Sequence, residues 1–123
     1  MLYKTDTRTD FDILVPNCPE LDSRLADQLL EAADSCSENG RSLILDFQPI
    51  LSLNKENVHW MEQLHKDFYA RQCSLVFCHL HTACQQEVAI AGLEHTLNIT
   101  PTLQEAIDMV QMEKLERELL NDL

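Results

Sequence analysis

Residues 41–68, with the sequence RSLILDFQPILSLNKENVHWMEQLHKDF, decide the fold prediction. The apolar run Ser42–Phe47 predicts a buried strand, and Gln48–Leu53 predicts a bridging loop. A helix packed back on the strand is predicted by apolar residues three or four positions apart, at Val58, Met61, Leu64 and Phe68. In open α/β sheets, ligands and partners usually bind where a strand's carboxyl end meets a helix N-terminus. We therefore expect the functional surface at this loop.

The chain before this unit contains two short runs of β-forming residues. Leu2–Lys4 and Phe11–Val15 predict strands, separated by the polar Thr5–Asp10 segment, and together they are compatible with a hairpin. A rigid loop follows at Pro16–Pro19. Beyond it, Asp22 is a suitable N-cap for a helix running to about residue 36, and Gly40 stands where a left-handed helix stop is expected.

The chain after this unit predicts two more strands, each followed or preceded by a helix. Cys73–His79 predicts a buried strand, and Thr82 with Gln85 has the spacing of a capping box for a short helix that stops at Gly92. Residues 96–99 predict the last short strand, and Thr102 with Glu105 predicts a second capping box. That box opens a long final helix through residue 119.

The resulting order is β-β-α-β-α-β-α-β-α, which predicts an α/β fold with a mostly parallel, mixed sheet of about five strands and about four helices. Residues 1–123 fit a single domain. We expect residues 111–123 to extend the last helix. Its apolar stripe, Met112, Leu115 and Leu119, would lie along its own domain or against a second copy in a homodimer.

Composition excludes several classes of function. The formal net charge of -12 makes nucleic acid and membrane partners improbable, because phosphate backbones and anionic lipids are repelled. The sequence has no membrane-length apolar run and no signal-peptide core, so we expect a cytoplasmic protein. Its two glycines both serve as helix stops, which leaves no phosphate-cradling loop for a nucleotide cofactor. The sequence predicts no cofactor.

Cysteine and histidine residues raise the question of a metal site. The five cysteines are odd in number and lack CxxC spacing, so we interpret most of them as small buried apolar residues. A metal remains an alternative at Cys78, His79, His81 and Cys84, where His79 and His81 would share a face of an extended chain. A fourth ligand, if Cys84 does not suffice, would have to come from Cys18 or His59. On this alternative the protein is a small ligand- or metal-binding sensor.

Catalysis is not predicted by any motif. Cys-His nucleophilic chemistry needs a paired base and an orienting group, and the sequence selects no such pair. Asp46, at the end of the central strand, could be a carboxylate in a cleft, but an acid at this place more often satisfies loop amides. We expect a protein that is not an enzyme.

The central stretch also resembles the STAS domain (sulphate transporter and anti-sigma-factor antagonist), especially stand-alone bacterial anti-anti-sigma proteins. The resemblance rests on Leu45-Asp46-Phe47 at the strand end, on Ala91-Gly92-Leu93, and on Pro101-Thr102-Leu103-Gln104-Glu105-Ala106. In the family the central strand is followed by Asp-Ser-Ser/Thr-Gly, whose serine is phosphorylated. Read in register, this sequence has Asn54, Lys55, Glu56 and Asn57 there. The family's phosphoserine therefore falls on Lys55, which cannot form a phosphate ester.

The resemblance implies a non-enzymatic interaction module that binds an anti-sigma factor, usually a kinase-like ATP-binding protein, and so releases the sigma factor. It implies a partner surface at the loop and the helix start, with the upstream loop beside it; the candidate residues are Ser52, Leu53, Asn54, Lys55, Glu56, Asn57, Trp60, Asn17 and Cys18. Phosphorylation at the usual position would be lost, and Ser52 is a weak substitute acceptor. Trp60 is either a partner anchor or a cover for the edge of the core.

Overall fold

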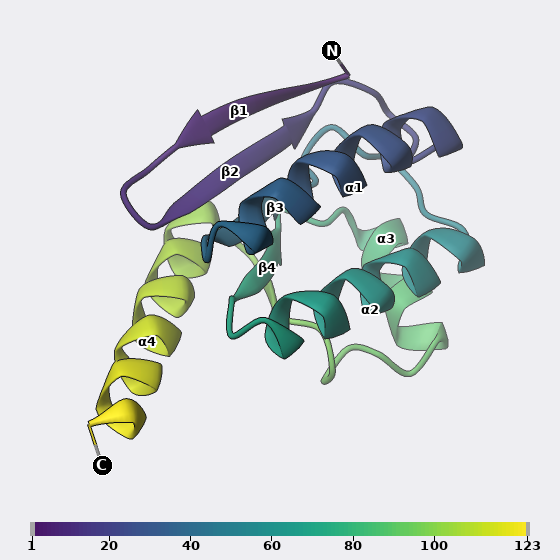
Figure 1. Cartoon of the computed structure of the whole chain (residues 1–123). Helices are drawn as coiled ribbons and strands as arrows, with labels where there is room; N and C mark the ends of the chain where they lie inside the picture. Colours follow the sequence, from purple (N-terminus) through teal and green to yellow (C-terminus); the bar gives the residue numbers. More distant parts are fainter. Residues whose placement is uncertain (1, 123) are drawn as a thin grey trace.

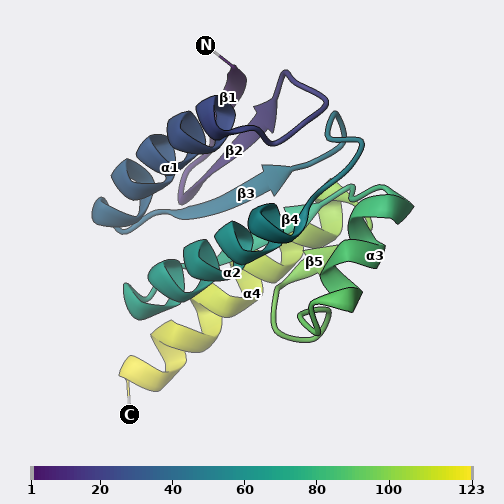
Figure 2. The same ribbon diagram turned by 90° about the vertical axis from the view of Figure 1, so that its right-hand side faces the viewer.

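The computed structural model describes residues 2–122 and has the predicted order of elements. One five-stranded sheet runs in the order β1-β2-β3-β4-β5, with β1 antiparallel to β2 and every other neighbouring pair parallel. The elements are β1 (Tyr3–Thr7), β2 (Phe11–Pro16), α1 (Ser23–Glu38), β3 (Ser42–Asp46), α2 (Lys55–Ala70), β4 (Leu75–Cys78), α3 (Thr82–Ile90), β5 (Ile99–Thr100) and α4 (Leu103–Asn121). Helices α1, α2 and α3 cover one face of the sheet and α4 the other (Figures 1 and 2).

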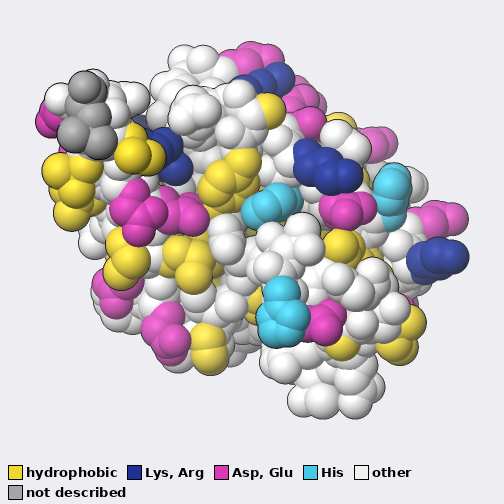
Figure 3. All heavy atoms as spheres, turned by 90° about the horizontal axis from the view of Figure 1, so that it is seen from below, with side chains coloured by type: hydrophobic (Ala, Val, Ile, Leu, Met, Phe, Trp, Pro, Cys, Tyr) yellow, Lys and Arg dark blue, Asp and Glu magenta, His cyan; other side chains and the backbone are white. Residues whose placement is uncertain are grey.

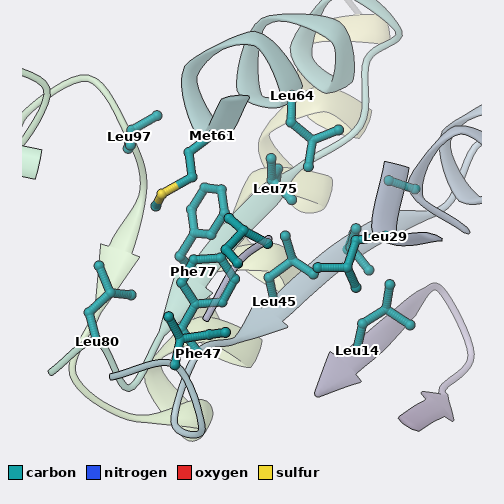
Figure 4. Packing of buried hydrophobic residues seen from close by; sticks show 14 of the residues in the cluster. Leu14, Leu29, Leu45, Phe47, Met61, Leu64, Leu75, Phe77, Leu80 and Leu97 are labelled. Atoms are coloured by element: carbon teal, nitrogen blue, oxygen red, sulfur yellow. The ribbon is translucent and has the colours of Figure 1, made fainter. Parts of the chain in front are cut away.

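Central strands β3 and β4 are buried along their whole length because helices cover both faces of the sheet. Side chains alternate between the faces, so Leu45 joins the large core under α1 and α2, whereas Ile44 joins the smaller core under α4. The large core is centred on Phe47 and Phe77, whose rings meet edge to face with centroids 5.4 Å apart. Figure 4 shows Met61 of α2 directed towards these rings.

The two outer strands differ from the sequence predictions. Strand β1 continues to Thr7, through part of the predicted turn, and pairs in register with Asp12 of β2. An edge strand needs only its backbone to pair, so exposed polar side chains do not end it. Strand β5 lies at Ile99–Thr100 instead of 96–99, because the Leu97 amide donates to the Leu93 carbonyl and closes a turn there.

The helix starts are predicted correctly in two cases and wrongly in one. Asp22 Oδ1 accepts the Leu25 amide at 2.9 Å, and Thr102 Oγ1 accepts the Glu105 amide at 3.2 Å. The predicted Thr82 cap is wrong: Thr82 is the first residue of α3, and His81 is its N-cap without a side-chain hydrogen bond. Gln85 instead donates from Nε2 to the Leu80 carbonyl.

The predicted helix stops are confirmed. Gly40 and Gly92 follow α1 and α3 with φ of 70° and 74°, a conformation that side chains of L-residues rarely adopt.

Helix α4 extends along its own domain and leaves an apolar stripe exposed. Its inner face is fixed by Lys114, whose Nζ lies 3.1 Å from Asp10, and by Arg117, which donates to Ser74 Oγ at 3.0 Å. The exposed fractions of the outward stripe are 60%, 56% and 58% at Met112, Leu115 and Leu119. Hydrophobic and acidic side chains interleave around this end of the molecule (Figure 3). Within residues 2–122, no helix is both long and apolar enough to cross a bilayer.

Candidate functional site

The loop between β3 and α2 is fixed to the upstream loop by backbone contacts. The Leu51 amide donates to the Pro19 carbonyl at 2.8 Å, and Ser52 forms a parallel bridge with Glu20. Ile50 and Leu53 are buried and anchor the loop to the large core. The two loops are therefore neighbours at residues 19 and 20, which directly follow the Asn17–Cys18 pair that the resemblance assigned to this surface.

The start of α2 is closed by a reciprocal pair of asparagines. The Asn57 amide donates to Asn54 Oδ1 at 2.8 Å, and the Asn54 amide donates to Asn57 Oδ1 at 3.0 Å. Asn54 is the N-cap of α2, and the pair forms a capping box. Asn57 also donates from Nδ2 to the Leu21 carbonyl at 2.7 Å, so one side chain fastens the helix start to the upstream loop. The Asn-x-x-Asn spacing was the available signal for the cap, but nothing in the sequence pointed to Leu21.

The predicted surface residues divide into those that line a shallow pocket and those that do not. The pocket beside the helix start is lined by Glu20, Leu21, Asp22, Ser52, Leu53, Asn54 and Asn57. Lys55 and Glu56 are exposed next to it on the first turn of α2, and Asn17 is exposed further back on the upstream loop. Cys18 and Trp60 are half-buried and pack against the large core, so Trp60 covers the core's edge while keeping part of its surface exposed.

Lys55 places a positive charge where the helix already presents positive amide dipoles. The helix macrodipole disfavours a cation in the first turn, by about 0.3–1 kcal/mol at an exposed position. Glu56 complements the dipole at the next residue. Within residues 2–122 no carboxylate lies within 4.0 Å of the Lys55 ammonium, which leaves it available to an acidic group from outside the chain.

A second groove adjoins Lys55, and sequence reasoning missed it. Lys55, Val58, His59 and Glu62 line it from α2, and Ala91 and Leu93 line it from the segment after α3. Ile90, at the end of α3, is 79% exposed. No sequence pattern indicated this groove, because its two walls come from segments about thirty positions apart. This groove enlarges the candidate surface from the helix start to the α2–α3 boundary.

The Cys78–Cys84 segment does not bring together the four residues considered as an alternative metal site. His79 has φ of 59°, so the premise of an extended chain carrying His79 and His81 on one face is wrong. His81 Nε2 approaches the Gln48 carbonyl oxygen at 2.6 Å, and buried Cys84 donates from Sγ to the Ile50 carbonyl at 3.7 Å. Cys18 and His59, considered as a further ligand, do not join the cluster that forms instead.

Three other groups do come together at the carboxyl ends of β3 and β4. His79 Nδ1 lies 3.0 Å from Asp46 Oδ1 and 4.0 Å from Cys78 Sγ. Among the residues described, this is the one group of three or more potential ligands placed for a metal ion. Asp46 Oδ1 also accepts the Gln48 amide at 3.0 Å, which confirms its predicted role of satisfying a loop amide.

The buried cysteines behave as apolar side chains. Four of the five are buried and all five are free thiols. Burial raises the pKa of Cys36 and Cys78 to about 12, with a smaller contribution from nearby carboxylates, and burial also raises the pKa of Cys73 and Cys84. These thiols are neutral near pH 7 when no cation lies beside them, and nucleophilic thiolate chemistry is correspondingly disfavoured.

Comparison with solved structures identifies the same fold in several proteins. A Thermotoga maritima protein, described as a "putative anti-sigma factor antagonist", matches this chain with a TM-score of 0.79 and 17% sequence identity. The match covers 89% of this chain and 94% of that chain. The anti-sigma factor antagonist SpoIIAA of Bacillus, in its unphosphorylated form, matches with a TM-score of 0.72 and 16% sequence identity. The match covers 89% of this chain and 96% of SpoIIAA. The murine anion transporter Slc26a9 matches with a TM-score of 0.71 and 12% sequence identity, and the match covers 87% of this chain but 18% of the transporter.

These likenesses share the fold at low identity, and the fold occurs both in small regulators and within a transporter. No match was found among curated protein sequences. The family model described as "STAS domain" matches residues 5–106, from β1 to the first turn of α4. The chain therefore belongs to the STAS domain family.

Proposed function

We propose that this protein is a non-enzymatic interaction module of the anti-sigma-factor-antagonist type. Its partner would be an anti-sigma factor or a related serine-kinase-like regulator, bound through residues 52–60 and the adjoining 17–22 loop. The observation that carries the proposal is the fastened helix start, where Asn57 joins α2 to the Leu21 carbonyl at 2.7 Å and leaves Lys55 exposed. A surface held in one shape before binding loses less conformational entropy when a partner docks.

Phosphorylation at the family's usual position is not expected. Lys55 occupies that position, and its side chain cannot accept a phosphoryl group. Ser52 is exposed in the same loop, but its backbone is held in the bridge to Glu20. We propose that partner binding is constitutive or is controlled elsewhere. Incubation with the partner kinase and ATP, followed by mass spectrometry of residues 48–60, would contradict this if a phosphate were found there.

Two features favour a binding role over catalysis and over other partner classes. Asp46 and Cys78 both approach the same ring nitrogen of His79, whereas a nucleophile–base–acid relay needs the two nitrogens on opposite sides. The net charge of -12 also repels nucleic acid and anionic membranes. The cytoplasmic location remains a prediction.

The predicted homodimer also remains a prediction. Pairing of two α4 stripes would bring Glu116 of each chain close to the seam, and like charges there oppose association. Light scattering at low and high salt would decide it, since a dimer of this kind would gain stability as salt screens the acids.

The decisive experiment for the proposed function is affinity capture from native lysate with and without Mg-ATP. The baits are the parent protein, Lys55→Glu, and the matched control Lys66→Glu, which reverses the same charge at an exposed position further along α2. We expect the parent and Lys66→Glu to recover an anti-sigma factor or kinase-like ATPase, and Lys55→Glu to recover about tenfold less, a loss of roughly 1.4 kcal/mol.

The identified partner would then be produced in pure form and its dissociation constant measured against all three proteins. Equal binding of the parent and Lys55→Glu would place the interface elsewhere. Failure of every bait to recover such a regulator, under conditions where all three are folded, would count against the proposed function itself.

A further inference from the structure

The cluster formed by Asp46, Cys78 and His79 lies outside the proposed partner surface. Asp46 and Cys78 are register partners on the parallel strands β3 and β4. Because side chains alternate along a strand, Asp46 lies on the same face of the sheet as Ile44, and Cys78 on the same face as Val76. This is the face covered by α4, whereas α2 and its N-terminal loop lie against the other face. The cluster therefore requires its own explanation.

The backbone at His79 directs the imidazole towards the ends of the two strands. A φ of 59° is uncommon for a residue with a side chain, although histidine is among those that tolerate it. In this conformation the chain turns immediately after β4, and Nδ1 comes within 3.0 Å of Asp46 Oδ1 and 4.0 Å of Cys78 Sγ. One oxygen, one sulfur and one nitrogen all lie within 4.8 Å of one another.

We propose that Asp46, Cys78 and His79 form a binding site for a zinc ion. Zinc binds thiolate, imidazole and carboxylate ligands at about 2.3, 2.0 and 2.1 Å, so ligand atoms at tetrahedral corners stand about 3.3–3.7 Å apart. The two separations from His79 Nδ1, 3.0 and 4.0 Å, lie on either side of that range and differ from it by about 0.3 Å, and the Asp46 oxygen and the Cys78 sulfur lie within 4.8 Å of each other. Small rotations of the imidazole and the thiol would equalise them.

The charges of this ligand set suit a divalent ion. On binding, the Cys78 thiol releases its proton to solvent and forms the S–Zn bond, while the His79 ring carries its proton on Nε2 so that Nδ1 can bind. The resulting thiolate and the Asp46 carboxylate carry two negative charges, which neutralise the ion. Sulfur and nitrogen ligands favour zinc over magnesium or calcium, which prefer oxygen.

Neighbouring groups orient the three ligands and leave the site open to solvent. The Gln48 amide holds Asp46 Oδ1 at 3.0 Å, and the β3–β4 register holds the two strand ends together. The His79 side chain is 30% exposed, so the site opens to solvent on the imidazole side. Three protein ligands would leave a fourth position for water or for a small donor ligand.

Cobalt(II) is the probe for the test, because it enters zinc sites and its visible spectrum reports thiolate ligation and tetrahedral geometry. The full chain, kept reduced, is titrated with cobalt and then with zinc as competitor. We expect saturation near one equivalent, a sulfur-to-cobalt charge-transfer band, and displacement by one equivalent of zinc.

The variants assign the ligands. Asp46→Asn, Cys78→Ser and His79→Asn should each weaken binding by about tenfold or more, and Cys78→Ser should abolish the charge-transfer band. Asparagine is chosen at position 79 because it tolerates a positive φ. The matched controls His81→Gln and Cys84→Ser change a histidine and a cysteine in the same segment outside the cluster, and should leave binding unchanged.

Circular dichroism and thermal melts of every variant separate loss of ligand from loss of fold. The proposal is overturned if the folded parent binds no cobalt or zinc near stoichiometry, or if the band survives Cys78→Ser. It is equally overturned if the two controls lose binding as much as the cluster variants. Because the partner capture described above requires no metal, either result leaves that proposal standing or falling on its own evidence.

Discussion

At the scale of single residues, Asn54 and Asn57 account for the shape of the candidate surface. The side-chain oxygen of each accepts the other's backbone amide, and Asn57 also donates from Nδ2 to the Leu21 carbonyl. The sequence could predict the cap, because asparagine is a favoured N-cap residue. It could not predict the link to Leu21, which depends on where a distant loop passes.

The two asparagines make unequal contributions that substitution can separate. Asn54→Ala should lower the free energy of unfolding by about 1 kcal/mol, through loss of one cap hydrogen bond, whereas Asn54→Ser should largely retain it. Asn57→Ala should cost at least as much and should also loosen the 17–22 loop. Urea denaturation measures the first effect, and amide hydrogen exchange at residues 20–22 measures the second. Unchanged exchange in Asn57→Ala would show that the backbone contacts alone hold the loop.

His79 shows a limit of sequence reasoning at the same scale. The sequence offers metal-ligand residue types between positions 78 and 84, but their spacing could not show which of them come together in the fold. Its choice depended on a positive φ at His79 and on the register that places Asp46 beside Cys78. Neither feature can be predicted from the periodicity of the sequence.

At the scale of elements, α4 shows how one helix can have two unlike faces. Its first half buries Ala106 and Val110 against the sheet, and its second half is held by the cationic groups of Lys114 and Arg117. Lys114 and Arg117 lie on the side of the helix that faces the domain. The charged residues left beside the outward stripe at 112–119 are therefore acidic. The family model ends at residue 106, so this stripe belongs to the part of the helix beyond the family match.

A pair of truncations tests this division of α4. Val110→Ala removes two methyl groups from a side chain that is 2% exposed, and should lower the free energy of unfolding by about 2 kcal/mol. Leu115→Ala, one and a half turns later on the same helix, removes more apolar volume but should change stability by less than about 0.5 kcal/mol. Thermal or urea unfolding compares them. A large cost for Leu115→Ala would mean that the stripe is covered in solution.

At the scale of the whole molecule, the fold was predictable because its strongest signals are regular. Fully apolar runs gave β3 and β4, helical spacing gave α2, and the alternation of strands with helices implied parallel pairing. The sequence predictions placed the ends of the outer strands β1 and β5 wrongly, because these strands bury little side-chain surface and are defined by backbone pairing. The resemblance implied that the two loops are neighbours, but the contacts that join them could not be predicted, since they link residues more than thirty positions apart.

The helix stop at Gly40 has a consequence for handedness. Its φ of 70° disfavours L-residues, yet no atom beyond the adjacent residues lies within 4 Å of a Cβ added there, so an L-alanine would suffer local backbone strain without a clash against the rest of the protein. We expect Gly40→Ala to destabilise the protein by about 1 kcal/mol. Chemical semisynthesis with D-alanine at the same position should instead stabilise it by about 0.4–1 kcal/mol, because the mirror-image residue prefers this conformation and restricts the unfolded chain. Comparison of the two melting curves isolates the contribution of chirality at one position, and a destabilising D-alanine would show that the turn requires glycine for a reason other than its backbone angle.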